Sequence, residues 1–173
     1  LLKGLFEELD SLTSALGDLA TKYGSVVKPG RTHLMDAAPI RYGQVFEGWR
    51  RTLSKDGDRL RKASEMLIEL NLGASAVGTG VNAEPEYVDE ALRFLSAKTG
   101  FQFRSPASFV DVTHSMPDLL WVSSSLKALA VDVSKICNDL RLMNSGPVTG
   151  FGDVTLPAVQ PGSSIMPGKV NPV

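Results

Sequence analysis

The sequence predicts an elongated all-α bundle, and three observations support this fold class. Two stretches near the ends of the chain repeat apolar residues with gaps that alternate between three and four. Each repeat lasts about three heptads, which favours long helices that pack nearly parallel to one another. The segments between the periodic stretches are rich in glycine and proline, which is typical of loops at helix ends. The chain is therefore expected to be a helical bundle with its polar loops gathered at the ends.

The two heptad stripes define the first and the last long helix. The first stripe consists of Leu2, Leu5, Leu9, Leu12, Leu16, Leu19 and Tyr23, and the last consists of Leu119, Val122, Leu126, Leu129, Val133, Ile136, Leu140 and Met143. A less regular stripe over residues 45–70 predicts a third long helix, and the apolar pattern of this stripe is interrupted at Asp56 and Gly57. A shorter helix is expected over residues 86–98, because Pro85 precedes it and Gly100 follows it.

Three connecting segments are predicted to be loops: residues 27–39, 73–85 and 146–172. Three long helices and a short one cannot cover every face of such stripes. We therefore expect the remaining apolar surface to be buried against other copies of the chain. A self-contained monomeric bundle is the alternative that this pattern leaves open.

Composition excludes several classes of function. Eighteen Lys and Arg against nineteen Asp and Glu give a net charge of −1, without the basic excess that binds nucleic acid or anionic lipid. No apolar run approaches the ~20 residues that a membrane span needs. Cys137 is the single cysteine, so an intrachain disulfide is impossible and a soluble, cytoplasmic protein is expected. Cys137 itself is expected to be a small buried apolar residue.

Metal and nucleotide chemistry receive no support from the motifs. With two histidines and one cysteine, a Cys/His zinc site is not expected, and neither HExxH nor EF-hand spacing occurs. The glycines near residue 80 have no preceding strand and no P-loop lysine, so a Rossmann or Walker site is not predicted. We expect neither a cofactor nor a bound metal.

Two loops combine a constrained backbone with polar side chains. In the second, over residues 162–172, Gly162 allows a sharp turn, Ser163 and Ser164 supply hydroxyl groups, and Lys169 and Asn171 stand two residues apart. Such a loop can hold an anion. An ordinary surface loop is the plainer interpretation of its composition. The first loop is Gly30-Arg31-Thr32-His33. Taken alone, its histidine is more typical of a structural residue than of a catalytic one, and His114 is expected to be structural as well.

The amino-acid sequences of these two loops resemble those of a known family. GSSIMPGKVNP at residues 162–172 resembles the signature loop of the aspartase/fumarase superfamily, and GRTHLMDAAPI at residues 30–40 resembles its second shared region. LGASAVGTGVN at residues 72–82 and SKICNDLRLMNSGP at residues 134–147 are similar to further family stretches. The resemblance is nearest to the aspartase and class II fumarase branch, and residues 134–147 are more similar to aspartases.

The resemblance implies a reversible β-elimination that yields fumarate, with ammonia leaving in aspartases and water in fumarases. It implies that Ser163 is the general base and that an aci-carboxylate forms, which needs positive charge and N–H donors around it. Lys169 would offset the carboxylate charge, Asn171 would add a directional donor, and Thr32 and His33 would hold a substrate carboxylate and the leaving group. Gly162 and Ser164 are implied as loop support.

Family members are considerably longer than this chain. The resemblance therefore implies that residues 1–173 are part of a central helical-bundle domain, without the N-terminal domain or the C-terminal part. It also implies a homotetramer in which each active site takes its shared regions from three subunits. We accordingly expect the 173-residue chain to be inactive on its own.

Four positions depart from the family pattern: Met35 stands where Gln is usual, Val45 where Glu is common, Val148 where an Arg is common, and Asp153 near a usual Glu. These changes leave open an altered substrate preference. Besides the ammonia-lyase, two alternatives stay open: a class II fumarase and a helical scaffold without catalysis, as in the lens crystallins related to this superfamily.

Overall fold

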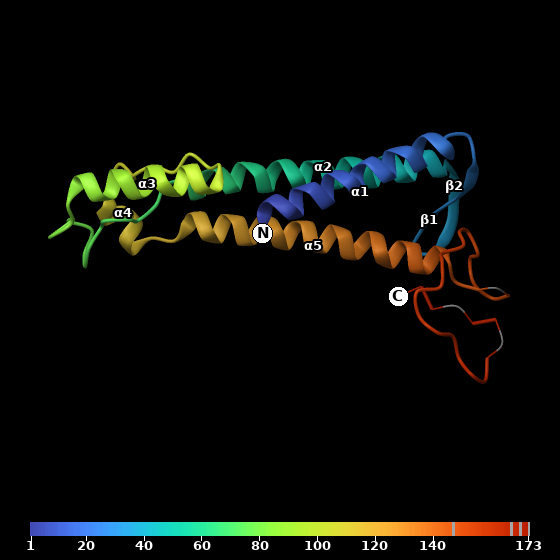
Figure 1. The fold of residues 1–173 in the computed structure, drawn as a ribbon. Coiled ribbons are helices and arrows are strands. Elements are labelled where there is room, and N and C mark those ends of the chain that lie inside the picture. The colour runs from blue at the N-terminus through green and yellow to red at the C-terminus, as the bar shows by residue number, and fades with distance from the viewer. Residues whose placement is uncertain (147, 167, 170, 173) are drawn as a thin grey trace. The chain divides into compact units, whose positions relative to one another are not determined.

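The computed structural model describes residues 1–146, 148–166, 168–169 and 171–172. Its helices and strands follow in the order α1 (Leu2–Lys22), β1 (Val27–Thr32), β2 (Met35–Arg41), α2 (Tyr42–Glu65), the 3-10 helix η1 (Met66–Ile68), α3 (Pro85–Thr99), α4 (Phe109–His114) and α5 (Pro117–Met143) (Figure 1). The chain divides into two compact units, the first made of residues 1–55 and 129–173 and the second of residues 56–128. The predominantly α architecture predicted from the heptad stripes is confirmed.

The first unit buries the stripes of α1 and α5 together with aromatic residues of α2. Its buried apolar side chains are Leu9, Leu16, Phe46, Trp49, Leu53, Leu129, Ile136 and Met143. The ring of Phe46 meets that of Trp49 edge-on, with centroids 5.6 Å apart. The buried members of α1 and α5 recur at heptad spacing, as the sequence pattern predicted, although Leu12 of the first stripe is exposed.

The end of α1 and the start of α2 are joined by backbone contacts. The amide of Gly43 donates to the carbonyl of Tyr23 at 3.0 Å, and the amide of Tyr42 donates to the carbonyl of Val26 at 2.9 Å. A side chain at residue 43 would place its Cβ 2.6 Å from the carbonyl oxygen of Ala20, so this close approach requires glycine.

The third long helix predicted from the sequence is confirmed, and it is continuous where its apolar pattern is interrupted. Helix α2 continues through Asp56 and Gly57, both of which are buried. Arg59 lies three residues further along the helix and donates to the Asp56 carboxylate at 2.5 Å. A local partner therefore makes the buried carboxylate compatible with a continuous helix.

Two predictions from the sequence were wrong. Residues 27–41 form an antiparallel hairpin of β1 and β2, where a loop had been expected up to residue 39. The Pro-Gly pair at residues 29 and 30, which suggested a loop, lies inside β1. Cys137 is exposed, because it lies next to Ile136 but off the buried stripe of α5.

The second unit is built around Leu60, Ala63, Val88, Leu92 and Val122. Helix α3 begins with proline at its first position and ends at Gly100 in the left-handed conformation, as the flanking residues predicted. His114 is the last residue of α4 and is exposed. Among the residues that the structure describes, no helix is both long and apolar enough to cross a membrane.

Candidate functional site

The tip of the hairpin, residues 32–35, carries two of the predicted site residues. Thr32 ends β1, Met35 begins β2, and His33 and Leu34 form the turn between them. Both turn residues have positive φ, 51° and 64°, a combination that two-residue hairpin turns need but usually obtain from Asn-Gly. Strained conformations of this kind gather at functional sites. Thr32 and His33 are exposed, so the turn presents both side chains to solvent.

The hairpin is held across its two strands by Arg31. Its Nε donates to the Asp36 carboxylate at 3.1 Å, and the two residues are paired in the strand register. The register shifts between Gly30 and Arg31, since Gly30 pairs with Ala38. Such a bulge increases the local twist and redirects the strand near its end.

A buried ion-pair cluster joins the hairpin to the segment after α5. The cluster consists of Asp153, Lys28, Arg31 and Tyr42, and is called here the Asp153 cluster. Arg31 donates to both carboxylate oxygens of Asp153, from Nη1 at 2.6 Å and from Nη2 at 3.3 Å, and Lys28 Nζ lies 3.1 Å from Oδ2. The Asp153 side chain is only 7% exposed. The Tyr42 hydroxyl donates to the backbone carbonyl of Asp153.

The two cations decide the charge state of Asp153. Burial alone raises the pKa of this carboxyl, but the hydrogen bonds from Arg31 and Lys28 outweigh burial and lower the pKa below its ordinary value. The same contacts raise the pKa of Arg31. The guanidinium also lies 4.1 Å from the centre of the Phe151 ring, a cation–π contact. Asp153 is therefore ionised at neutral pH.

The signature loop, residues 162–172, is closed on itself. Gln160 and Asn171 form an antiparallel bridge, the Val159 amide donates to the Asn171 carbonyl at 3.2 Å, and the Asn171 side-chain amide donates to the Pro161 carbonyl at 2.8 Å. A side chain at residue 162 would place its Cβ 2.4 Å from the carbonyl oxygen of Lys169, so Gly162 permits this closure. Pro167 and Val170, which belong to the predicted loop, lie outside the described residues.

The three predicted polar residues of the loop differ in their surroundings. The Ser163 Oγ is half-buried and accepts the amide N–H of Ile165 at 3.3 Å. The Lys169 side chain is exposed, and so is Ser164, which follows Ser163 in the loop. The bond from Asn171 to Pro161 uses one N–H of an amide group that has two. Ser163, Lys169 and Asn171 thus lie on one short loop that is closed on itself.

A cavity of about 1120 Å³ lies between the signature loop and the C-terminal end of α5. Asn138, Arg141 and Asn144 line it from the α5 side, and Met166 and Lys169 line it from the loop. Sequence reasoning had not selected Arg141 or Asn138. Their spacing of three residues, which places both on one helix face, is the signal that could have found them. The lining mixes apolar side chains with two cations, Arg141 and Lys169, and these cations suit an anionic ligand.

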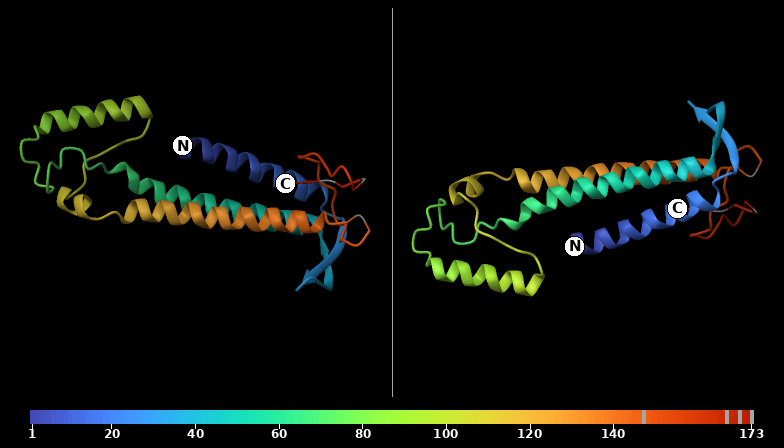
Figure 2. Two further views of the ribbon diagram at one scale, coloured as in Figure 1. Left: turned by 90° about the horizontal axis from the view of Figure 1, so that it is seen from below. Right: turned by 90° about the horizontal axis from the view of Figure 1, so that it is seen from above.

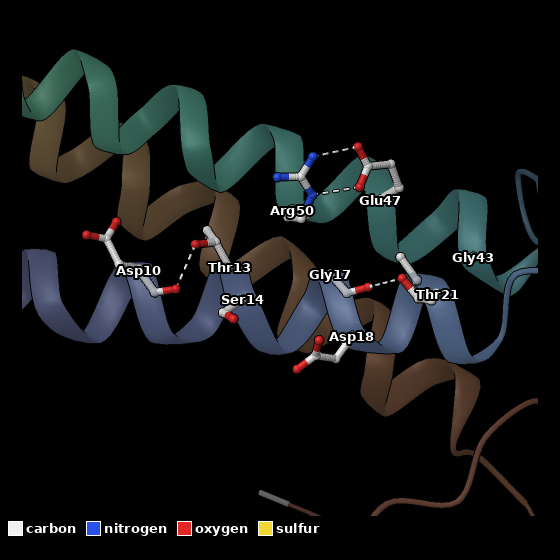
Figure 3. Close-up of a pocket in the computed structure, with 10 residues that line it drawn as sticks. Asp10, Thr13, Ser14, Gly17, Asp18, Thr21, Gly43, Glu47 and Arg50 are labelled. Atoms are coloured by element: carbon white, nitrogen blue, oxygen red, sulfur yellow. Dashed lines mark hydrogen bonds and ion pairs between the residues drawn. The ribbon is translucent and has the colours of Figure 1, made fainter.

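A second cavity, of about 690 Å³, lies between α1 and α2 and contains none of the predicted site residues (Figure 3). Arg50 donates to both carboxylate oxygens of Glu47 at 2.6 and 2.7 Å, and Arg51 binds the same carboxylate. These hydrogen bonds lower the pKa of Glu47 to about 2. Thr13 and Thr21 donate to carbonyl groups of their own helix. Glu47, Arg50, Thr13 and Thr21 are thus each engaged within their own helix.

Within one chain the predicted residues form two separate sets. Thr32 and His33 belong to the hairpin, and Ser163, Lys169 and Asn171 belong to the signature loop. Figure 2 shows the hairpin and the C-terminal segment directed to opposite sides of the helices of the first unit. The Asp153 cluster is a contact between β1 and the segment after α5, and it includes none of the predicted site residues.

A family profile described as a lyase matches residues 1–173, the whole chain. The chain belongs to this lyase family, the superfamily of aspartases and class II fumarases. It is 47% identical to the aspartate ammonia-lyase of Bacillus subtilis over 173 residues, which are all of this chain and 36% of that protein. It is 46% identical to the class II fumarate hydratase of Xylella fastidiosa over 169 residues, 98% of this chain and 36% of that protein.

The fold of this lyase chain also matches a solved structure. The fumarate lyase:delta crystallin from Brucella melitensis bound to cobalt superposes with a TM-score of 0.88 at 43% identity, covering 95% of this chain and 36% of that one. The lyase chain thus spans about a third of the length of the relatives it matches. Its resemblance to the superfamily, first noted in the two motif loops, is confirmed over the whole chain.

The structure also places the four positions that depart from the family pattern. Met35 lies at the exposed hairpin tip, Val148 is exposed, and Val45 is half-buried on α2. Asp153 is the exception, because its side chain forms the centre of the buried cluster. One of the four positions therefore has a visible structural role.

Proposed function

We propose that the full-length protein catalyses the reversible β-elimination of ammonia from L-aspartate to give fumarate. The observation that carries this proposal is the 47% identity to an aspartate ammonia-lyase over the entire chain, with Ser163, Lys169 and Asn171 gathered on one closed loop. The substrate is then a dicarboxylate, and the reaction is a carbon–nitrogen bond cleavage.

In this mechanism Ser163 removes the proton next to the carboxylate that becomes the aci-carboxylate. The Ile165 amide supports the role, because an N–H donor at Oγ favours the negatively charged alkoxide over the hydroxyl. Lys169 offsets the second negative charge that develops on the substrate carboxylate, and Asn171 offers an N–H to it. The loop has the exposure that a segment closing over a substrate needs.

Thr32 and His33 are assigned to the other end of the substrate, where they hold a carboxylate and the leaving group. They lie on a different segment from the signature loop, so we propose that a homotetramer supplies the two segments from different subunits. Exposed apolar side chains on α5, such as Val131 and Leu142, are compatible with such an assembly. The 173-residue chain alone would then lack activity, and the single cysteine fits a cytoplasmic location.

A class II fumarase is the second candidate, because a fumarate hydratase matches this chain at 46% identity. The two functions differ in the leaving group, which is ammonia or water. The full-length protein should be assayed in parallel with L-aspartate and L-malate, following the ultraviolet absorbance of fumarate. Turnover of aspartate alone supports the proposal, and turnover of malate alone replaces it with the second candidate. Absence of both activities would favour a helical scaffold.

A further inference from the structure

Asp153 occupies a position that the reaction scheme leaves without a role. It is buried and ionised, yet it lies nine residues before the signature loop and 122 residues after Arg31 in the sequence. The Asp153 amide donates to the carbonyl of Met143 at 2.8 Å, and the Gly152 amide donates to the carbonyl of Ser145 at 2.8 Å. The backbone at residue 153 is therefore fixed against the C-terminal end of α5.

From this fixed point the carboxylate reaches β1. Arg31 donates two hydrogen bonds to the Asp153 carboxylate, and such a two-pronged contact restrains the orientation of a guanidinium more strictly than a single bond does. Arg31 immediately precedes Thr32 in the strand, and it also holds Asp36 on the opposite strand. A continuous set of contacts thus leads from α5 through Asp153 and Arg31 to the hairpin tip.

We propose that Asp153 is a positioning residue, which holds Arg31 and Lys28 so that the hairpin presents Thr32 and His33 to the substrate. The inference rests on the proposed function, because it takes the roles of Thr32 and His33 from there. The tip needs such a support, since its turn has positive φ at two residues other than glycine. A substitution at Asp153 should therefore loosen substrate binding without removing the chemical groups of the signature loop.

The test uses the full-length protein with the variants Asp153→Asn and Asp153→Glu. Asn keeps the shape but loses the charge, whereas Glu keeps the charge. We expect Asp153→Asn to raise KM for L-aspartate about tenfold with kcat within roughly threefold of the wild type, because the loss falls on binding. We expect Asp153→Glu to restore KM toward the wild-type value. A merely structural role would lower the amount of active enzyme and leave KM unchanged.

Hydrogen exchange gives a second readout that does not depend on activity. Amides of residues 30–36 should exchange faster in Asp153→Asn than in the wild type, and slowly again in Asp153→Glu. If the wild type makes no fumarate, the proposed function fails, and this readout alone decides whether Asp153 orders the hairpin. Unchanged exchange in Asp153→Asn would overturn the inference in either case.

Two further variants complete the experiment. Arg31→Lys keeps the charge but loses the two-pronged contact, so it should raise KM in the same direction even if Asp153→Asn fails to fold. Glu90→Gln is the matched control, because it removes a carboxylate from an exposed ion pair with Arg93 on α3. A rise of KM in the control as large as in Asp153→Asn, or an unchanged KM in Asp153→Asn and Arg31→Lys, would overturn the assignment.

Discussion

Replacing Ser163 with alanine in the full-length protein separates a chemical role from a structural one. The substitution removes Oγ, which accepts one N–H from Ile165 at 3.3 Å on an exposed loop. Losing a single hydrogen bond of this kind costs about 1.5 kcal/mol at most. Because 1.4 kcal/mol corresponds to about a factor of ten, loss of this contact alone lowers activity no more than about tenfold.

The expected chemical effect is larger than this limit. A positioned general base contributes about 10²- to 10⁴-fold to the rate. We therefore expect Ser163→Ala to lower kcat for L-aspartate by about that factor with little change in KM, because the interaction is made in the transition state. The initial rate of fumarate formation, followed by ultraviolet absorbance over a range of aspartate concentrations, gives both constants.

The neighbouring serine provides the matched control. Ser164→Ala makes the same chemical change one residue along the same loop, at an exposed position. Its loss of kcat should stay below about tenfold, because only loop support is affected. The reasoning is refuted if Ser163→Ala retains kcat within tenfold of the wild type, or if Ser164→Ala is the more damaging of the two.

Three other predictions concern the folded chain. In the 173-residue chain Cys137 should react with a thiol reagent without denaturant, because it is exposed; a reaction that starts only on unfolding would contradict this. The pKa of Glu47 in the folded chain is lowered to about 2, so its ionised form stabilises the fold above pH 4.5 and this stability is lost as the pH falls toward 2. The denaturation midpoints of wild type and Glu47→Gln should therefore converge over that range. Leu53→Ala should cost about 2–5 kcal/mol in urea unfolding, since Leu53 is buried, and the half-exposed Leu12→Ala should cost clearly less.

The long helices could be predicted because their physical signal is local and repeated. A helix that buries one face must place an apolar residue at every third or fourth position, and this spacing is visible in α1 and α5 without any knowledge of their partners. The hairpin gives no comparable signal. His33 and Leu34 occupy the turn positions, where an Asn-Gly pair would have predicted a hairpin. The Pro-Gly pair that suggested a loop lies within β1.

In the candidate site, too, the local features could be predicted from the sequence and the long-range contacts could not. The motif loops were found because their residues are contiguous, so Ser163, Lys169 and Asn171 could be selected together. The contact between Arg31 and Asp153 joins residues 122 positions apart, and a single sequence contains no information that pairs them. The exposure of Cys137 was missed for a different reason: residue type alone suggested burial, whereas its position off the buried stripe of α5 places it at the surface.

The distribution of charge is compatible with the proposal that one chain does not complete the site. Lys28 and Arg31 lie in β1 of the hairpin, and both are engaged in ion pairs, Lys28 with Asp153 and Arg31 with Asp153 and Asp36. The exposed Lys169 lies instead on the signature loop, beside a cavity that Arg141 also lines. A dicarboxylate that develops a further negative charge needs donors at both of its ends. In one chain the hairpin and the C-terminal segment are directed to opposite sides of the helices (Figure 2), which is compatible with the proposal that a neighbouring subunit brings a second tip to each loop.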